Sequence, residues 1–155
     1  MITIKPHHFI DIIKLYGGGI EKFVPCEAFG HDFYKVANEI IGNLDVELKL
    51  TIYGDDICKP CNRYNGTECT DALSGINGFC KKEAYNRELD TRVLTLLNLK
   101  TDESYTARQF SNQLYQYEDV IFLVWKEEKC ENTDTRNALF QKGCEKLIAK
   151  SILKG

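Results

Sequence analysis

The chain has 155 residues and a formal net charge of −3, with 43% hydrophobic and 28% charged residues. This length suits one domain with a single core, and the composition excludes an intrinsically disordered chain. Because the acidic balance comes without a dense block of Lys or Arg, the sequence lacks the electrostatic footprint of nucleic-acid or membrane-surface binding. We therefore expect neither nucleic acid nor membrane as a partner.

The sequence does not predict membrane insertion or export. No apolar run approaches the roughly 20 residues that span a bilayer, and His7, His8 and Asp11 interrupt the apolar core that a signal peptide needs. We therefore expect a cytoplasmic protein. In that reducing compartment cysteines serve as metal ligands, nucleophiles or buried apolar groups rather than in disulfides. The odd count of seven cysteines points the same way.

The first part of the chain predicts a short strand followed by two helices. Residues 2–4 alternate apolar and polar side chains, which indicates a strand that ends before Pro6. From Pro6 the apolar spacing becomes helical, and Gly17–Gly19 ends this helix. The triple glycine lacks the spaced pattern of a phosphate-binding loop. A second helix is predicted over residues 28–41, with His31 on its surface.

The clearest strand is "VELKLTIYG", residues 46–54, in which apolar and polar side chains alternate strictly. Its natural partner is the strand at residues 2–4. We predict parallel pairing, because the intervening chain contains a helix and parallel strands need such a connection. Parallel pairing would place His7 and His8 beside Asp55, whereas antiparallel pairing would place them near the start of the strand.

The rest of the chain is mainly helical apart from a long loop. Residues 54–80 form an irregular segment, which is uncommon in a compact domain unless something orders it. Helices are predicted over residues 81–97, over 105–117 and, after a polar turn at 131–134, up to about Leu153, while 118–125 forms a helix or a strand. The fold class is therefore a single, mainly helical α+β domain over residues 1–155, with a small two-strand element and a long cysteine-rich loop.

The loop sequence "GDDICKPCNRYNGTECTD" carries the strongest chemical signal. Cys58 and Cys61 form a C-x2-C pair, and Cys69 and Cys80 follow. A turn between two such cysteines can direct both sulfurs at one metal centre, and four thiolates would complete a zinc site or hold an iron–sulfur cluster. Such a centre would also order the loop, because the free energy of metal binding becomes folding free energy.

Other interpretations of the loop remain open. Its second half is not another C-x2-C, so it is no standard zinc ribbon, and nearby acidic residues are unfavourable beside four thiolates. A redox pair of the thioredoxin type would need a helix after Cys58, which Pro60 opposes. The cysteines can also be purely structural. Among the other cysteines, we expect Cys26 and Cys144 to be buried and Cys130 to be exposed.

Two histidines and two aspartates are candidates for acid–base chemistry. His7 and His8 stand at a helix start, where adjacent side chains point about 100° apart, so only one of them can easily face a given site. Asp11 lies one turn from His7 and could orient its ring. Asp55 and Asp56 can cap the turn that opens the loop, or they can face the histidines as an acid–base or metal-binding pair.

With "IKPHHFIDII" and the cysteine loop both in view, the chain resembles a family of uncharacterised, cysteine-rich bacterial and archaeal proteins. Members carry H-H-L after a basic residue, then D-D-I-C with further cysteines, then a segment like "LDTRVLTLLNL"; this chain has Phe9 in place of the usual Leu. The resemblance covers most of residues 2–100 and implies a suspected iron–sulfur cluster but no established reaction. Its motifs fall on His7, His8, Asp55, Asp56, Cys58, Cys61, Cys69 and Cys80.

The sequence thus supports three functional hypotheses. The first is a cytoplasmic metal-binding protein with Cys58, Cys61, Cys69 and Cys80 as metal ligands, holding iron–sulfur by a slight preference over zinc. The second is a small enzyme in which His7 or His8 acts as general base and Asp55 or Asp56 orients it. Its small-molecule substrate would react at an open metal or at Cys58. The third is a structural or partner-binding protein. The sequence predicts no oligomeric state.

Overall fold

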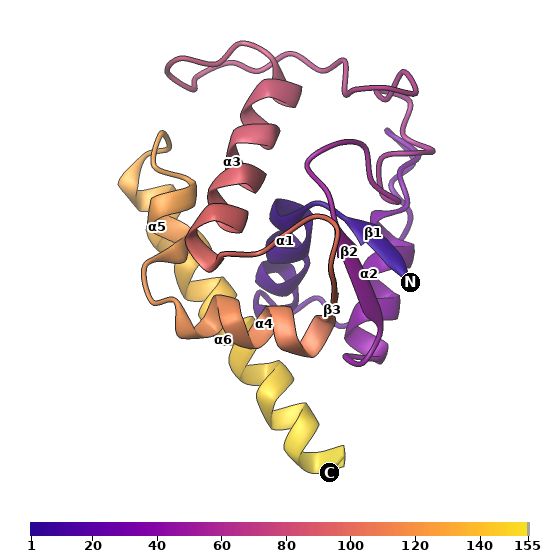
Figure 1. Cartoon of the computed structure of the whole chain (residues 1–155), viewed down its shortest axis with the longest axis vertical. Helices are drawn as coiled ribbons and strands as arrows, with labels where there is room; N and C mark the ends of the chain where they lie inside the picture. The colour runs from indigo at the N-terminus through magenta and orange to yellow at the C-terminus, as the bar shows by residue number, and fades with distance from the viewer. Residues whose placement is uncertain (155) are drawn as a thin grey trace.

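In the computed structural model, which describes residues 1–154, five helices and a three-stranded sheet surround the sixth helix, α1 (Figure 1). The mainly helical α+β fold predicted from the sequence is therefore confirmed. No helix in residues 1–154 is long and apolar enough to cross a membrane. The elements in chain order are β1 (Ile2–Ile4), α1 (Pro6–Gly17), α2 (Phe33–Gly42), β2 (Glu47–Leu50), α3 (Lys82–Leu97), β3 (Ser104–Thr106), α4 (Ala107–Gln116), α5 (Val120–Val124) and α6 (Cys130–Lys154).

The sheet has the order β1-β2-β3. Strands β1 and β2 are parallel, with Ile4 opposite Leu50, as the helical connection between them predicted. Strand β3 pairs antiparallel with β2 and was not predicted, because three residues are too few for an alternating pattern. Its last residue, Thr106, also begins α4 through a capping box with Gln109, in which each side chain binds the other's backbone N–H.

Helix α2 is shorter than predicted, because residues 26–32 form irregular chain before it. Gly30 has a φ of 68°, in the left-handed region that a helix cannot use. This segment instead contacts the cysteine loop: the Asp32 amide donates to the carbonyl of Ile57. His31 therefore lies ahead of α2 rather than on its surface.

Two features of the C-terminal part also differ from the sequence prediction. The apolar run at residues 118–125 contains the short helix α5, which the sequence left open between helix and strand. The expected turn at residues 131–134 lies inside α6, which begins at Cys130. The Thr133 hydroxyl donates to the carbonyl of Lys129, so a polar side chain at this helix start is satisfied locally.

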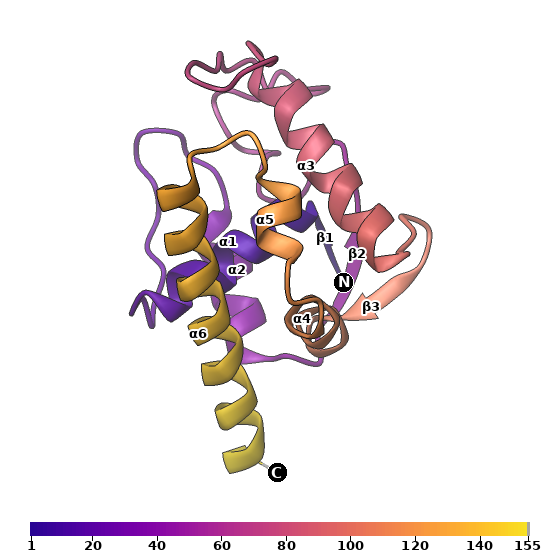
Figure 2. The same cartoon turned by 90° about the vertical axis from the view of Figure 1, so that its left-hand side faces the viewer.

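Helix α1 is the centre of the hydrophobic core and packs against α3 and α6 (Figures 1 and 2). Its residues Phe9, Ile10, Ile12 and Ile13 have no exposed surface. The ring of Phe9 stacks on that of Phe110 in α4, with ring centroids 4.7 Å apart. A helix buried on this scale has a fixed orientation, so the residues at its N-terminal end are held in place.

Helices α1 and α6 approach each other at a pair of glycines. A Cβ at Gly143 would overlap the carbonyl group of Ile13, and one at Gly17 would overlap the backbone at Leu139 and Gly143. Gly17 therefore ends α1, as predicted, and also lets the two helix backbones touch.

Replacement of Gly143 by Ala should destabilise the protein by about 3 kcal/mol, because the added methyl group must push the two helices apart. Urea unfolding followed by circular dichroism measures this loss. Gly42→Ala is the matched control: a Cβ there meets nothing within 4 Å, and its stability should lie within about 1 kcal/mol of wild type. Equal stability of the two variants would contradict the close helix contact.

Candidate functional site

The candidate site lies where the parallel strands β1 and β2 end on the same edge of the sheet. Lys5 follows β1 and leads into α1, and Asp55 lies in the loop that follows β2. The loop between β2 and α3 crosses the end of the molecule opposite the C-terminus, near the first turn of α1 (Figure 1). The parallel pairing thus brings the start of the cysteine loop to the histidine pair.

Asp55 is fully buried, and each of its carboxylate oxygens accepts two hydrogen bonds. Oδ1 accepts from the amides of Ile57 at 3.1 Å and Cys58 at 3.0 Å. Oδ2 accepts from the amide of Lys5 at 2.8 Å and lies 2.7 Å from Nδ1 of His8. These four contacts use the hydrogen-bonding capacity of the carboxylate, so Asp55 caps the loop turn and orients His8 at the same time.

The His8–Asp55 pair is buried, and it is an ion pair whenever His8 is protonated. Burial opposes the charge on His8, but the attraction of Asp55 and their hydrogen bond outweigh it and raise the His8 pKa above its ordinary value. Burial likewise opposes the charge on Asp55, yet His8 and the donated N–H groups lower the pKa of that carboxyl. Because Asp55 holds Nδ1, Nε2 is the ring nitrogen left for a ligand or a proton transfer.

His7 has a different partner from the one its sequence neighbours suggested. Its Nδ1 lies 2.9 Å from Oδ1 of Asp90 in α3, and its backbone amide donates to the same oxygen at 2.7 Å. Asp11 instead pairs with Arg136 of α6. Burial lowers the pKa of His7 and raises that of Asp90, which favours the uncharged form of each partner, and their contacts tie α1 to α3.

Asp56 points away from the histidines. Its Oδ2 accepts from the amide of Thr3 at 2.9 Å, and its Oδ1 pairs with Lys59 at 3.2 Å. The amide of Asp56 in turn donates to the carbonyl of Thr3. The structure therefore assigns Asp56 to the attachment of the loop to β1, while Asp55 alone of the two aspartates faces His8.

Three of the four loop cysteines line one cavity of about 150 Å³: Cys58, Cys61 and Cys69. His8 and His31 line the same cavity. Cys80 is exposed and lies outside this lining. The structure thus brings three predicted metal ligands and one predicted base to a common space, and it adds His31, which the sequence placed on a helix surface.

Protein contacts order the cysteine loop along its length. The amide of Asn62 donates to the carbonyl of Phe29, and the amide of Cys69 donates to the Glu83 carboxylate at 2.9 Å. Residues 64 and 69 form a β-bridge, which makes a small hairpin between the second and third loop cysteines. These contacts fix the thiol-bearing turns against α3 and against the irregular chain before α2.

The cavity lining is rich in positive charge. Lys5, Arg63 and Lys82 line it together with one acidic residue, Asp71, and that carboxylate pairs with Arg63 at 3.6 Å and with Lys82 at 3.8 Å. Lys5 is only 2% exposed. The negative charge of nearby aspartates, which seemed unfavourable beside thiolates, is therefore already matched by cations at this end of the molecule.

Sequence reasoning missed Lys5, His31, Glu83 and Asp90 as parts of the site. Lys5 stands directly before the helix that carries the histidines, and a lysine at the end of a buried parallel strand was an available signal. Glu83 and Asp90 gave none, because an acidic residue on a helix is ordinarily solvated. The remaining cysteines behave largely as expected: Cys144 is buried and Cys130 exposed, while Cys26 is half-buried.

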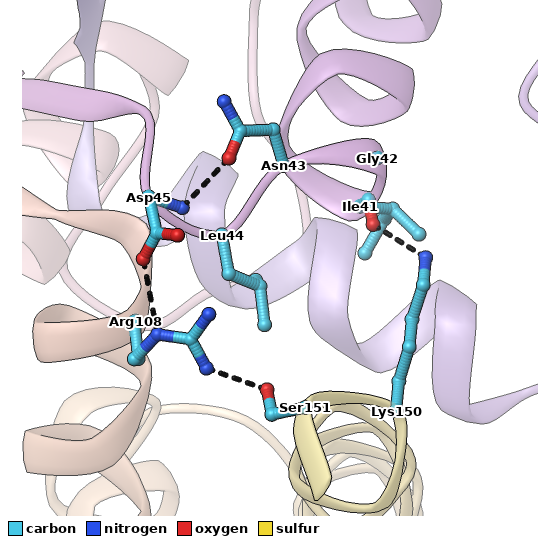
Figure 3. Close-up of a pocket in the computed structure, with 8 residues that line it drawn as sticks. All are labelled: Ile41, Gly42, Asn43, Leu44, Asp45, Arg108, Lys150 and Ser151. Carbon is cyan, nitrogen blue, oxygen red and sulfur yellow. Dashed lines mark hydrogen bonds and ion pairs between the residues drawn. The ribbon is translucent and has the colours of Figure 1, made fainter. Parts of the chain in front are cut away.

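A second hollow, of about 250 Å³, lies toward the other end of the molecule, between the end of α2, the start of α4 and the last turns of α6 (Figure 3). Its charged groups bind one another: Arg108 pairs with Asp45 at 3.1 Å and donates to Ser151 at 2.6 Å. Lys150 donates to the carbonyl of Ile41 at 2.7 Å. These contacts hold the end of α6 in place, so this hollow is part of the scaffold.

Comparison with known proteins assigns the chain to a family. The family model described as "Protein of unknown function (DUF1284)" matches residues 26–138, which is more than half of the chain. The chain belongs to the DUF1284 family. The DUF1284 match includes Asp55 and the four loop cysteines and continues beyond residue 100, but His7 and His8 precede it. Searches of the curated proteins and of the solved structures gave no match.

Replacement of Asp55 by Asn should cost about 3 kcal/mol of stability, because the amide cannot accept all four hydrogen bonds and leaves His8 without its counter-charge. Urea unfolding at pH 6 measures the loss. Asp56→Asn is the neighbouring control and should cost about 1 kcal/mol, since it removes a charge from a partly exposed position. A loss for Asp55→Asn no larger than that of the control would contradict the role given to Asp55.

The pH dependence of this loss has a defined sign. Because the pKa of Asp55 is lowered from 3.8, its contribution is complete above that value and fades as the pH falls toward the lowered pKa. Because the pKa of His8 is raised from 6.5, the ion-pair contribution is complete below that value and fades as the pH rises through the raised pKa. The stability difference between wild type and Asp55→Asn should therefore be largest between pH 4 and pH 6.5.

Proposed function

We propose that this DUF1284 protein binds a metal centre in the cysteine-lined cavity, with Cys58, Cys61 and Cys69 as ligands. The observation that carries the proposal is the convergence of these three thiols, spread over twelve positions of the loop, on one cavity beside His8. Thiolates are the ligands that zinc and iron–sulfur clusters prefer. Cys80 is a weaker candidate ligand, because it lies outside the cavity lining.

The properties of Cys58 favour a ligand over a free nucleophile. Burial and the nearby Asp55 carboxylate raise the pKa of its thiol to about 12. A thiol with that pKa is protonated at neutral pH and reacts poorly, because the thiolate is the nucleophilic form. A bound metal ion would remove the proton outright. The same thiol is therefore inert alone and competent as a ligand.

The arrangement of donors favours an iron–sulfur cluster over a single zinc ion. Four thiolates around zinc lie about 3.8 Å from one another, given Zn–S bonds of about 2.3 Å. Among residues 1–154, the group of donors found within 4.8 Å of one another is His8, Asp55 and Cys58, with only one cysteine. The oxygens of Asp55 are already taken by four hydrogen bonds. A cluster, in which each thiolate binds its own iron, accepts more widely spaced cysteines.

The charges around the cavity also fit an anionic thiolate centre. Lys5 and Lys82 line the cavity, and the pKa of Lys5 is raised: burial opposes its charge, but nearby Cys58 and acidic groups outweigh that effect. Of these two lysines Lys5 is buried, and a buried cation offsets charge that thiolates bring into a site of low dielectric constant. When bound, a three-cysteine cluster would supply electron transfer or a Lewis-acidic iron with an open position.

An enzyme is the second candidate, and the His8–Asp55 contact of 2.7 Å is the observation that favours it. A carboxylate on Nδ1 fixes the tautomer and raises the basicity of the ring, which suits a general base or acid acting through Nε2. In this version His8 moves a proton on a small molecule held beside the metal centre. His7 is not assigned this role, because it does not line the cysteine cavity and burial lowers its pKa.

Replacement of Cys58, Cys61 or Cys69 by Ser should each abolish or strongly reduce bound metal in anaerobically purified protein. Iron, acid-labile sulfide and zinc analysis together with the visible absorption spectrum measure this, since a cluster absorbs in the visible and zinc does not. Cys130→Ser is the control at an exposed cysteine outside the loop and should retain the wild-type metal content. Cys80→Ser should retain most of it.

Two results would overturn the proposal. One is wild-type protein with neither metal after anaerobic purification and reconstitution with iron and sulfide. The other is equal metal content in wild type and in all three cavity variants. If Cys80→Ser alone lost its metal, the ligands would have to be assigned to residues other than the three cavity cysteines.

A further inference from the structure

Lys5 carries a buried positive charge whose ion pair with Glu83 is longer than a hydrogen bond. Its side chain is 2% exposed and lines the cysteine cavity. Its ion-pair partner, Oε2 of Glu83, is 3.9 Å away, which is longer than a hydrogen bond. That carboxylate is engaged elsewhere, by the amide of Cys69 and by Arg87. An ammonium group withdrawn from water in this way is costly unless an anion supplies acceptors.

Asn86 of α3 offers a second hydrogen-bond donor at the same cavity. Its residue is 8% exposed, and it lines the cysteine cavity together with Lys5 and His8. Its side-chain amide is not among the fully buried, unpaired polar groups of residues 1–154, so it is accessible to a ligand in the cavity. Nε2 of His8 is also free of Asp55. Lys5, His8 and Asn86, from the β1–α1 junction and α3, thus line one space.

A larger cavity, of about 290 Å³, adjoins the first. His8, Lys82 and Asn86 line both cavities, so they form the boundary between them. The walls of this larger cavity include the apolar side chains of Leu89 and Trp125. The larger cavity therefore has room for the apolar part of a ligand directly beside His8 and Asn86.

In the larger cavity, the charged groups at the end that carries Arg136 and Glu128 already balance one another. Arg136 there pairs with Asp11 at 2.8 Å and with Glu128 at 3.7 Å, and its guanidinium lies 4.2 Å from the ring centroid of Trp125. The Tyr85 hydroxyl lies 3.2 Å from the Glu128 carboxylate. The Lys5 ammonium lies in the adjoining cysteine cavity, 3.9 Å from its carboxylate partner Glu83, so a ligand would bring its anionic group toward that end.

We propose that the two cavities form one binding site for a small carboxylate. Its acid group is held by the Lys5 ammonium, the Asn86 amide and His8, and its apolar part lies along Leu89 and Trp125. This placement rests on the proposed function in one respect, because it sets the carboxylate beside the metal centre. A carboxylate with an apolar chain fits better than inorganic phosphate, because the larger cavity has apolar walls that phosphate would not contact.

Isothermal titration of the metal-loaded protein under anaerobic conditions tests the proposal, with pentanoate as the probe. Pentanamide, its neutral counterpart, and inorganic phosphate, an anion without an apolar part, are the comparison ligands. Pentanoate should bind at least tenfold more tightly than either, because only it satisfies Lys5 and also fills the apolar part of the site.

Two variants and one control locate the site. Lys5→Met and Asn86→Leu, which keep the size of each side chain, should each weaken pentanoate binding at least tenfold. Lys59→Met should leave it unchanged, because Lys59 is an exposed lysine of the same loop that pairs with Asp56 outside the cavity. Metal content and circular dichroism are measured on every sample. If Lys5→Met does not fold, Asn86→Leu decides the result.

Several outcomes would overturn the proposal: no pentanoate binding to metal-loaded protein, equal binding of pentanoate and pentanamide, phosphate as the tighter ligand, or full binding by both variants. The failure of the proposed function is recognised separately. If wild-type protein takes up no metal on reconstitution but still binds pentanoate through Lys5, the carboxylate site stands and the metal centre is rejected. If the protein takes up metal but does not bind pentanoate, the metal centre stands and the carboxylate site is rejected.

Discussion

The buried carboxylate of Asp55 is the constraint on which the candidate site depends. Its four hydrogen bonds join three parts of the chain: the β1–α1 junction at Lys5, the first turn of the cysteine loop, and the ring of His8. A fully buried carboxylate is stable only with this degree of pairing. The positions of His8 and Cys58 are therefore coupled, and any change at Asp55 reaches both.

This coupling explains how an acidic loop can hold thiolates. The aspartates that flank the loop cysteines each have a defined partner: Asp55 has His8, Asp56 has Lys59, and Asp71 has Arg63 and Lys82. The cavity beside them is lined by three thiols and by basic and apolar side chains, and its one acidic lining residue, Asp71, is already paired. A centre with thiolate ligands would thus enter a region whose charge favours it, with Lys5 as its buried cation.

The sequence predicted the parts of the site that follow from local pattern and chain connection. The helical link between β1 and β2 predicted their parallel pairing, which brings Asp55 to His8, and the C-x2-C spacing identified Cys58 and Cys61. It could not predict His7–Asp90 or Cys69–Glu83, because these contacts depend on how α3 packs across α1 and the loop. The start of α2 was missed because the positive φ of Gly30 is a property of the tertiary contacts around it.

Native-state hydrogen exchange on the backbone amides bound by Asp55 tests the central claim most directly. The amides of Lys5, Ile57 and Cys58 should exchange slowly and with similar free energies of opening, because one carboxylate holds all three. All three should lose this protection together in Asp55→Asn. Exchange of Ile57 and Cys58 as fast as that of the exposed loop residue Gly75, while Lys5 stays protected, would contradict the account.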